Sequence, residues 1–349
     1  MQLSERAVVY APAWAGASSY DGSLPFPVFR HPTSLMLPEW TVRRRALAIM
    51  ASEGCDRILF GSAAPLGLLA PALRRAGARR IVAITHGHEA AWAAFPLARG
   101  LLRKIGDSVD VMTYLGDYFR RRLAKALSPE AAARMRRLAP GVDTSIFRPG
   151  CGGPDVRARL GLGTRPVILC VSRLVPRKGQ DALIRAMPMV LKATASGAVL
   201  LLVGDGSYAN KLRSLARKLG VASNVVFAGE IAADDLPAYY DTANVFAMPC
   251  RTRRSGMDVE GLGIVFLEAA ASGLPVIAGD SGGAPDAVRN AETGFVISGR
   301  DPDLLAQRLK QLLIDPAMAR SMGSKGRAWV EHSWRWDAVG QSLRGLLEL

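Results

Sequence analysis

Two glutamates eight residues apart, Glu260 and Glu268, have the residue type and spacing that most clearly suggest chemistry in this chain. A glycine-rich turn lies between them, and a short apolar stretch then ends at Gly273 and Pro275, residues that typically close a helix. Glu260 is therefore expected on a loop and Glu268 in the second turn of a helix. Because free amides at a helix start bind anions and carboxylates hold hydroxyls, the segment suits a nucleotide sugar.

The same pattern has an ordinary structural explanation, because glycine-rich loops often precede helices and the helix dipole favours glutamate in the first turn. A second motif supports the binding interpretation. Arg173 and Lys178 follow the apolar run 167–171, so both cations are expected at the carboxyl end of a strand, where ligands bind. Fixed cations there can stabilise a departing diphosphate. A solvated basic loop is the alternative, and Arg177 is expected to point away.

Three further glycine-containing turns follow predicted strands and are weaker signals. Gly204 lies in the first of these turns. Ile231 lies in the second, where main-chain groups could read a nucleobase edge. The third turn, 281–285, is expected to open another helix and to form a second anion-binding nest.

His86 is the candidate catalytic residue of the first half of the chain. It follows the apolar run 80–84 and is expected at the carboxyl end of that strand, facing the ligand site. A lone histidine is more often structural, but this position favours a functional role. His88 and Glu89 follow directly and are weaker candidates. No spacing of potential ligands in the sequence predicts a metal site.

The elements that must position these residues alternate between short apolar runs and helical stretches. Runs rich in Val and Ile are expected for parallel strands that are covered on both faces. The predicted strands are 7–10, 27–30, 57–60, 80–84, 109–114, 167–171, 198–203, 225–228, 245–248 and 275–278, and the predicted helices include 179–193 and 207–219. This alternation predicts an α/β fold with doubly wound, Rossmann-like domains.

A turn-rich segment at 140–154 predicts a domain boundary. We expect a first Rossmann-like domain at 1–148 that binds the acceptor, a second at 149–330 that binds the nucleotide sugar, and a C-terminal helix at 331–349 that packs back toward the first domain. Two such domains would face each other across a cleft at the carboxyl ends of their strands.

The composition favours a globular protein with a substantial core, since 49% of the 349 residues are hydrophobic and 21% are charged. The four cysteines form no CxxC pair and are predicted to be buried free thiols. No apolar stretch has the length of a membrane span, and the first residues have no signal-peptide pattern. These features predict a cytoplasmic protein.

The net charge is +15, and most of the excess lies in the first 150 residues. A basic surface can bind nucleic acid, anionic lipid or a phosphorylated substrate. Nucleic acid ranks low, because no nucleic-acid-binding motif is present. The segments 40–50 and 118–127 mix arginines with apolar residues and could lie on a membrane surface. Ordinary amphipathic helices with a solvated basic face are the alternative.

Taken together, the motifs resemble those of the retaining GT-B glycosyltransferases of family 4. Within that family the chain is most similar to the GDP-mannose-dependent phosphatidylinositol mannoside mannosyltransferases. The matching stretches are 31–38, 85–89, 140–143, 172–181, 246–253, 257–268 and 334–337. The block 246–288 is specific to the subfamily, whereas the paired glutamates and paired cations belong to the wider family.

The resemblance implies a role for each candidate residue. Arg173 and Lys178 would bind the donor diphosphate, and Glu268 would bind the ribose. Glu260 would bind the mannose together with the amides of Gly263, Ile264 and Val265, and His86 would contact the sugar and stabilise the developing positive charge. It implies transfer from GDP-mannose with retention of configuration and without a divalent metal. The acceptor is expected to be a phosphatidylinositol monomannoside, an anionic phospholipid, at the inner face of the plasma membrane.

The chain departs from the family pattern at its start. Family members have a strand, a glycine-rich loop and a helix before the segment that matches 7–10, and residues 1–6 correspond to the tail of that helix. The first domain is therefore expected to lack a central strand, which deprives the neighbouring strands of a pairing partner. This departure leaves open a nucleotide- or membrane-binding homologue without catalysis or with impaired catalysis. A second alternative is a nucleotide-sugar epimerase of similar two-domain build, which would need no acceptor.

Overall fold

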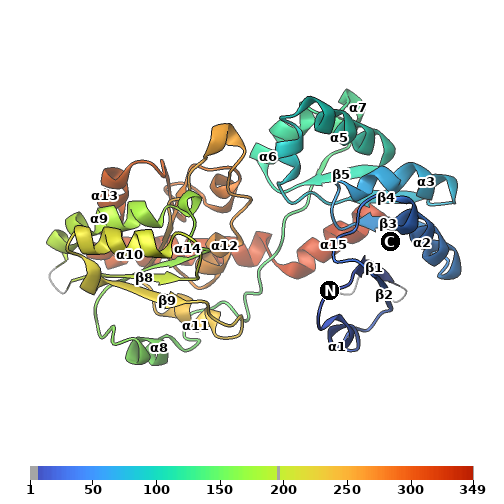
Figure 1. The fold of residues 1–349 in the computed structure, drawn as a ribbon. Coiled ribbons are helices and arrows are strands. Elements are labelled where there is room, and N and C mark those ends of the chain that lie inside the picture. Colours follow the sequence, from blue (N-terminus) through green and yellow to red (C-terminus); the bar gives the residue numbers. More distant parts are fainter. Residues whose placement is uncertain (1–6, 195–196, 349) are drawn as a thin grey trace. The chain divides into compact units, whose positions relative to one another are not determined.

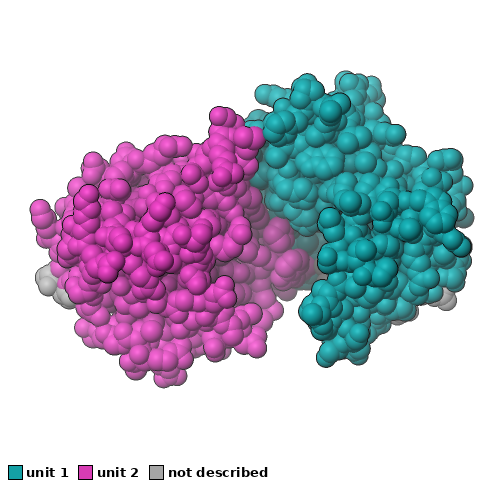
Figure 2. Space-filling view, viewed as in Figure 1, with its two compact units in different colours: residues 1–139, 337–349 teal, residues 140–336 magenta. Residues whose placement is uncertain are grey.

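Parallel β-sheets form the centre of both units of the chain, in a computed structural model that describes residues 7–194 and 197–348 (Figure 1). Unit 1 comprises Met1–Ala139 and Asp337–Leu349, and unit 2 comprises Pro140–Trp336 (Figure 2). Each unit has its own sheet and core, and each is considered by itself below.

Unit 2 contains a six-stranded parallel sheet in the order β12-β11-β10-β7-β8-β9. The strands are β7 (Val167–Val171), β8 (Val199–Val203), β9 (Val225–Gly229), β10 (Val245–Met248), β11 (Val276–Gly279) and β12 (Gly294–Ile297). Every residue of β7 and β8 is buried, as expected for continuous apolar runs at the centre of a covered sheet. The order reverses between β7 and β10, which makes this pair the topological switch point of a doubly wound sheet.

Helices cover this sheet. They are α8 (Gly153–Arg159), α9 (Gln180–Ala193), α10 (Ala209–Lys218), α11 (Leu236–Asp241), α12 (Ile264–Ala271), α13 (Pro302–Ile314) and α14 (Pro316–Ser333). In Figure 1, α9 and α10 lie on one side of β8 and β9, and α8 lies on the other. Helix α9 packs against α13, and α12 packs against α14.

The start of α9 depends on a glycine. Gly179 has φ +81°, and a Cβ atom there would lie 2.1 Å from the carbonyl oxygen of Pro249. Only glycine permits both this left-handed backbone and so close a crossing. The loop after β7 is thereby held against the loop after β10, which brings Lys178 to the switch point.

Unit 1 contains a four-stranded parallel sheet, β3-β4-β5-β6, and a separate parallel pair, β1-β2. The strands are β1 (Val9–Pro12), β2 (Val28–His31), β3 (Arg57–Phe60), β4 (Arg80–Ala83), β5 (Val111–Tyr114) and β6 (Arg136–Arg137). The helices are α1 (Ala17–Asp21), α2 (Trp40–Ser52), α3 (Ala70–Arg75), α4 (Glu89–Trp92), α5 (Pro96–Ser108), α6 (Asp117–Ala124), α7 (Pro129–Ala133) and α15 (Trp336–Leu347). Leu343 and Leu347 of α15 pack with Val82, Val111 and Leu138, so the last helix completes the core of unit 1.

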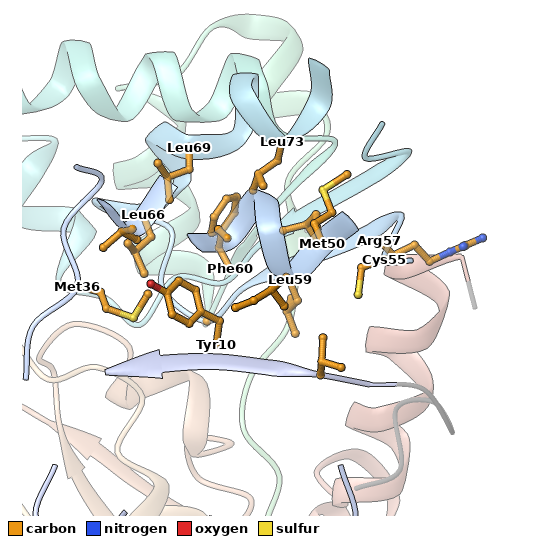
Figure 3. A pocket seen from close by; sticks show the side chains of 16 residues that line it. Tyr10, Met36, Met50, Cys55, Arg57, Leu59, Phe60, Leu66, Leu69 and Leu73 are labelled. Atoms are coloured by element: carbon orange, nitrogen blue, oxygen red, sulfur yellow. The ribbon is translucent and has the colours of Figure 1, made fainter. Parts of the chain in front are cut away.

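A cavity of about 180 Å³ lies between β1 and β3 (Figure 3). Its wall is largely apolar and includes Tyr10 of β1, Phe60 of β3 and Met50 of α2. Among the described residues, β1 pairs only with β2, and β3 pairs only with β4. This pairing agrees with the expectation from the sequence, and the loss of a strand itself stays a prediction. Residues 1–6, which were interpreted as the tail of a helix, lie outside the described residues.

The ten strands predicted from the sequence are present, and β6 and β12 are two that it missed. The boundaries between the two units fall at 139/140 and 336/337, whereas the sequence analysis predicted domain boundaries at 148/149 and 330/331. The difference arises because the segment after residue 139 is held on unit 2. Val142 donates its backbone N–H to the carbonyl of Trp334 at 2.8 Å, and the Arg327 guanidinium contacts the carbonyl of Phe147 at 3.3 Å.

Candidate active site

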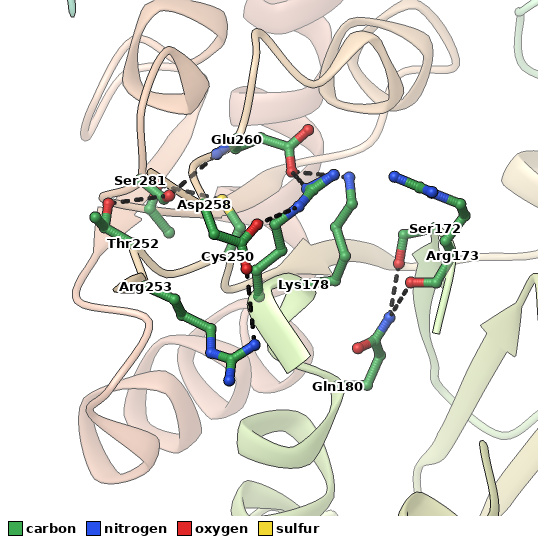
Figure 4. Close-up of polar contacts among 12 residues, drawn as sticks. Ser172, Arg173, Lys178, Gln180, Cys250, Thr252, Arg253, Asp258, Glu260 and Ser281 are labelled. Carbon is green, nitrogen blue, oxygen red and sulfur yellow. Dashed lines mark hydrogen bonds and ion pairs between the residues drawn. The ribbon is translucent and has the colours of Figure 1, made fainter. Parts of the chain in front are cut away.

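The candidate site of unit 2 lies at the carboxyl ends of β7 and β10, where the sheet order reverses (Figure 4). The loop after β7 carries Arg173, Arg177 and Lys178, and the longer segment after β10 carries Asp258 and Glu260. Ligands of doubly wound sheets bind at this switch point. The sequence therefore placed its strongest motifs on two loops that the fold brings together.

Glu260 is the centre of a buried ion-pair network. Lys178 Nζ lies 2.8 Å and Arg177 Nη1 lies 2.9 Å from the same carboxylate oxygen, Oε2. Lys178 and Glu260 are only 8% and 6% exposed. Removing one partner of such a buried pair is strongly destabilising, because the other charge is left uncompensated. The network therefore holds a charged carboxylate and a charged ammonium inside the protein.

Arg177 does not point away, so that prediction from the sequence was wrong. Its Nε atom lies 3.1 Å from Asp258 Oδ1 while its Nη1 atom holds Glu260. Arg177 thus bridges two carboxylates of one loop. Short-range sequence patterns do not contain this information, because the partners are separated by more than eighty residues.

Arg173 is a cation of the site that remains available to a ligand. Its side chain is exposed, and no hydrogen-bond or ion-pair partner of its guanidinium is found within the described part of the chain. Its main chain is fixed, because the fully buried Gln180 donates from Nε2 to the Arg173 carbonyl at 3.0 Å and to Ser172 Oγ at 2.8 Å. A fixed backbone with a free guanidinium suits the capture of an anion.

The turn 281–285 holds Glu260 and is not a free anion nest, so the sequence prediction for it was wrong. Glu260 donates its N–H to Ser281 Oγ at 3.2 Å, and Gly283 donates its N–H to the Glu260 carbonyl at 3.1 Å. Gly282 has φ +58°, and a Cβ atom there would lie 1.9 Å from that carbonyl oxygen. The expected helix is one 3-10 turn, Ala284–Ala287. The turn fixes the backbone that carries the carboxylate.

Glu268 lies in the second turn of α12, as predicted, but it contacts a different set of residues from Glu260. Tyr240 donates its hydroxyl to Glu268 Oε2 at 2.6 Å. Burial raises the pKa of Glu268, and the Tyr240 hydrogen bond acts in the opposite direction. Tyr240 is itself fully buried, with ring centroids 5.5 Å from Phe147 and 5.7 Å from Phe246. Sequence analysis missed Tyr240, because nothing local links it to Glu268.

The remaining predicted donor residues of unit 2 lie near the same edge of the sheet. Gly204 donates its N–H to the Gly229 carbonyl at 2.7 Å and ties the ends of β8 and β9 together. Ile231 is half-buried and follows β9 by two residues. Gly263 has φ +75° and precedes Ile264 and Val265 in the first turn of α12. Their contacts with a ligand stay predictions.

Two of the four cysteines are buried thiols, as predicted, and two are only half-buried. Cys250 follows β10, and burial, then the charge of Glu260, raises its pKa to about 12. The thiol therefore stays protonated near neutral pH and is a poor nucleophile. Within residues 7–194 and 197–348, no three His, Cys, Asp or Glu side chains gather as metal ligands.

His86 of unit 1 follows β4 and is exposed, as predicted for a residue at that strand end. Its Nε2 atom lies 2.5 Å from the Gly61 carbonyl and therefore donates to it. The fully buried Glu89 accepts from the N–H groups of His86 and Gly87 at 3.0 and 3.1 Å. Glu89 thus shapes the turn that presents His86. The contact of His86 with a ligand stays a prediction.

The two basic segments of unit 1 are helices, α2 and α6, and each buries some of its apolar residues, although Trp40 at the start of α2 is 65% exposed. Val42, Ile49 and Met50 of α2 are buried, as are Phe119 and Leu123 of α6. This is the arrangement of ordinary amphipathic helices. Helix α5, which the sequence analysis did not single out, instead exposes apolar side chains at its start: Phe95 is 54% and Leu97 is 89% exposed.

None of the helices that the structure describes has both the length and the apolar content of a membrane span.

Fold and site together define an α/β protein with a charged binding centre at the switch point of a doubly wound sheet. Two family models identify its family. The model of glycosyl transferases group 1 matches residues 154–329, and that of glycosyltransferase family 4 matches residues 3–146. The chain belongs to this glycosyltransferase family.

Relatives with assigned names share about half of the sequence. The chain is 50% identical over 343 residues to a GDP-mannose-dependent alpha-(1-6)-phosphatidylinositol monomannoside mannosyltransferase of Mycobacterium tuberculosis, covering 97% of this chain and 88% of the relative. It is 46% identical over 335 residues to the GDP-mannose-dependent monoacylated alpha-(1-6)-phosphatidylinositol monomannoside mannosyltransferase of Corynebacterium glutamicum, covering 95% and 86%. The predicted membership of this group is confirmed.

Solved structures place the fold among the GT-B glycosyltransferases. Sucrose-phosphate synthase from Thermosynechococcus elongatus matches with a TM-score of 0.73 and 25% identity, over 92% of this chain and 82% of that one. HepE from Anabaena, in complex with UDP and glucose, matches with a TM-score of 0.80 and 20% identity, over 99% and 92%. The α/β fold class predicted from the sequence is confirmed.

Proposed function

We propose that this chain transfers mannose from GDP-mannose to a phosphatidylinositol monomannoside with retention of configuration. The observation that carries the proposal is the network of Lys178, Arg177 and Glu260 beside the free Arg173 at the switch point. The substrate assignment is supported by relatives that are 50% identical over 97% of the chain and bear this activity in their names.

The paired cations are suited to a diphosphate leaving group. Without ligand, Lys178 neutralises Glu260 at 2.8 Å. An incoming diphosphate offers Lys178 and Arg173 a second anionic partner, while Arg177 keeps its hold on Glu260. The carboxylate can then accept hydrogen bonds from mannose hydroxyls. Because these fixed cations balance the charge that develops on the leaving group, we propose that the reaction needs no divalent metal.

The other residues position the donor. Glu268, oriented by Tyr240, is proposed to accept from the ribose hydroxyls. The amides at the start of α12 are proposed to face the donor, because a helix N-terminus favours anions. In unit 1, His86 is proposed to contact the transferred sugar. The departing phosphate serves as the base for the acceptor hydroxyl.

Unit 1 is proposed to bind the inner face of the plasma membrane, where the lipid acceptor resides. Helix α5 supports this, because Leu97 and Phe95 are exposed and the cations Arg99, Arg103 and Lys104 lie exposed along the same helix. Apolar insertion combined with basic residues is the usual mode of attachment to anionic lipid surfaces.

The test uses radiolabelled GDP-mannose with phosphatidylinositol monomannoside in mixed micelles. Glu260→Gln is the test variant, and Glu292→Gln, at an exposed carboxylate, is its matched control. We expect a lipid-linked mannose product with the wild type and the control, and at least ~100-fold less with Glu260→Gln.

Companion measurements on the same protein separate the alternatives. Binding of GDP by calorimetry without turnover would identify a non-catalytic homologue. Conversion of free GDP-mannose without acceptor, followed by NMR, would identify an epimerase. Efficient use of another donor and acceptor, with no mannosyl product, would reject the substrate assignment.

A further inference from the structure

A second basic pocket adjoins the ion-pair network in unit 2. It has a volume of about 400 Å³ and is lined by Arg173, Val175, Pro176, Arg177, Arg253, Arg254, Met257 and Asp258. Four of these eight residues are arginines, and only one is acidic. The roles proposed above use Arg173 and Arg177 but leave Arg253 and Arg254 unexplained.

The pocket has an uncompensated positive charge. Four arginines and one carboxylate, Asp258, are among the residues that line it, and the adjacent Lys178 and Glu260 balance each other, so these described residues leave three positive charges in excess. Arg251, on the same loop, does not add to this excess because Asp181 pairs with it at 2.6 Å. A sugar nucleotide brings two negative charges on its diphosphate, and one positive charge then remains. A phosphodiester carries one negative charge and would balance it.

The free charge is located at Arg254. Arg253 Nη1 lies 3.7 Å from Asp258 Oδ2, while Arg177 Nε approaches the other oxygen of the same carboxylate at 3.1 Å (Figure 4). The Arg254 guanidinium is exposed and has no partner among the residues that the structure describes. An arginine fork matches two phosphate oxygens, so Arg254 can take an anion without breaking an existing pair.

The loop presents these arginines in a constrained turn. Arg253 and Asp258 exchange backbone hydrogen bonds at 2.9 and 3.2 Å, which closes the turn. Within it, Arg254 and Ser255 have φ +48° and +52°, a left-handed backbone that costs roughly 1–2 kcal/mol per non-glycine residue. The closed turn keeps Arg253 and Arg254 at the wall of the pocket.

We propose that Arg254, supported by Arg253, binds the phosphodiester of the acceptor, so that unit 2 selects for a phosphorylated acceptor as well as for the donor. This inference rests on the proposed function. Arg253 contacts Asp258, Asp258 contacts Arg177, and Arg177 contacts Glu260. The proposed phosphodiester site at Arg253 and Arg254 is therefore linked to the proposed donor site at Glu260 by a short series of ion pairs. An acceptor that carries its phosphodiester near its sugar can reach both.

The kinetic test compares phosphatidylinositol monomannoside with octyl α-mannoside, a neutral acceptor. For Arg254→Gln we expect the preference for the phosphorylated acceptor, as a ratio of kcat/KM values, to fall about tenfold. Arg320→Gln removes the same charge from an exposed position on α14 and should leave that ratio unchanged. An equal loss with both acceptors, or no loss, would overturn the inference.

A binding test is independent of turnover. By calorimetry in the presence of GDP, we expect glycerophosphoinositol to bind the wild type and Arg320→Gln, and to bind Arg254→Gln about tenfold more weakly. Equal affinity for inorganic phosphate would assign the pocket to free anions and overturn the inference. If this binding follows the expectation while no mannose is transferred, the proposed function fails and the anion site stands.

Discussion

The hydrogen bond from Tyr240 to Glu268 gives the sharpest test of the donor site. Tyr240→Phe removes one hydroxyl from a fully buried ring and keeps the ring's contacts with Phe147 and Phe246. Glu268 loses the donor that lies 2.6 Å from its Oε2 atom. The substitution therefore isolates one charge-assisted bond, with little change in packing.

The loss of unfolding free energy on Tyr240→Phe depends on whether the Glu268 carboxyl is charged. A hydrogen bond to a charged group is worth about 1.5–3 kcal/mol, and a neutral one about 1 kcal/mol. Burial raises the pKa of Glu268 above its usual 4.5, so the folded chain keeps the proton longer than the unfolded chain as the pH rises. The contribution of Glu268 to the free energy of unfolding therefore falls as the pH rises from about 4.5 to the pKa of the folded state. Removing the hydroxyl raises the folded pKa further, so the loss grows with pH.

The assay is urea unfolding of the wild type and Tyr240→Phe at about pH 4.5 and about pH 8, with the free energy of unfolding as the readout. We expect a loss of about 1 kcal/mol at the lower pH and about 1.5–3 kcal/mol at the higher. GDP should also bind about tenfold more weakly, because Glu268 is no longer oriented.

Tyr239→Phe is the matched control for this prediction. Tyr239 is also buried, and its hydroxyl accepts from Arg159 Nη2 at 3.2 Å, away from Glu268. Its substitution should change stability without the extra pH dependence. A loss for Tyr240→Phe that is equal at both pH values would refute the assigned charge state of Glu268.

Three further perturbations test the site and the surface. Lys178→Met should lower kcat at least ~100-fold in the mannosyl-transfer assay, since a fixed cation at the leaving group is lost; an unchanged kcat would contradict its role. Gly282→Ala should lower the free energy of unfolding by about 3 kcal/mol in urea, because its Cβ atom would lie 1.9 Å from the Glu260 carbonyl oxygen. The control Gly220→Ala has a similar backbone, with φ +68°, but open space around it, and should lower the free energy of unfolding by only about 1 kcal/mol. Leu97→Glu should weaken co-sedimentation with anionic vesicles about tenfold without altering the thermal midpoint, since Leu97 is 89% exposed; unchanged sedimentation would remove α5 from the membrane surface.

The strands were predictable because their signal is local. β7 and β8 are continuous buried apolar runs of five residues, and short runs of this kind are typical of interior parallel strands. β6 has only two residues, both arginines, and forms by pairing with β5, so no periodic pattern marks it. β12 begins with a glycine, and its three apolar residues are too few to stand out in the sequence.

The positions of the site residues along the chain were predictable, but their partners were not. Glu260, Lys178 and Arg173 lie at the strand ends that the pattern indicated. Whether Arg177 points toward Glu260, or Tyr240 toward Glu268, depends on how distant segments pack. The turn 281–285 shows the converse error. Its glycines suggested an anion nest, but the Gly283 N–H already donates to the Glu260 carbonyl, and Ser281 Oγ accepts from the Glu260 N–H.

The cavity beside β1 and β3 has a consequence for the behaviour of the chain in solution. In the described part of unit 1, each of these strands pairs on one side only, and Val9 of β1 is 36% exposed. An unpaired strand edge presents a row of N–H and C=O groups that can template pairing with another polypeptide. Within the described residues, unit 1 has four strands that pair on one side only, β1, β2, β3 and β6, whereas unit 2 has two, β9 and β12, so unit 1 is expected to be the more prone to concentration-dependent self-association through strand pairing.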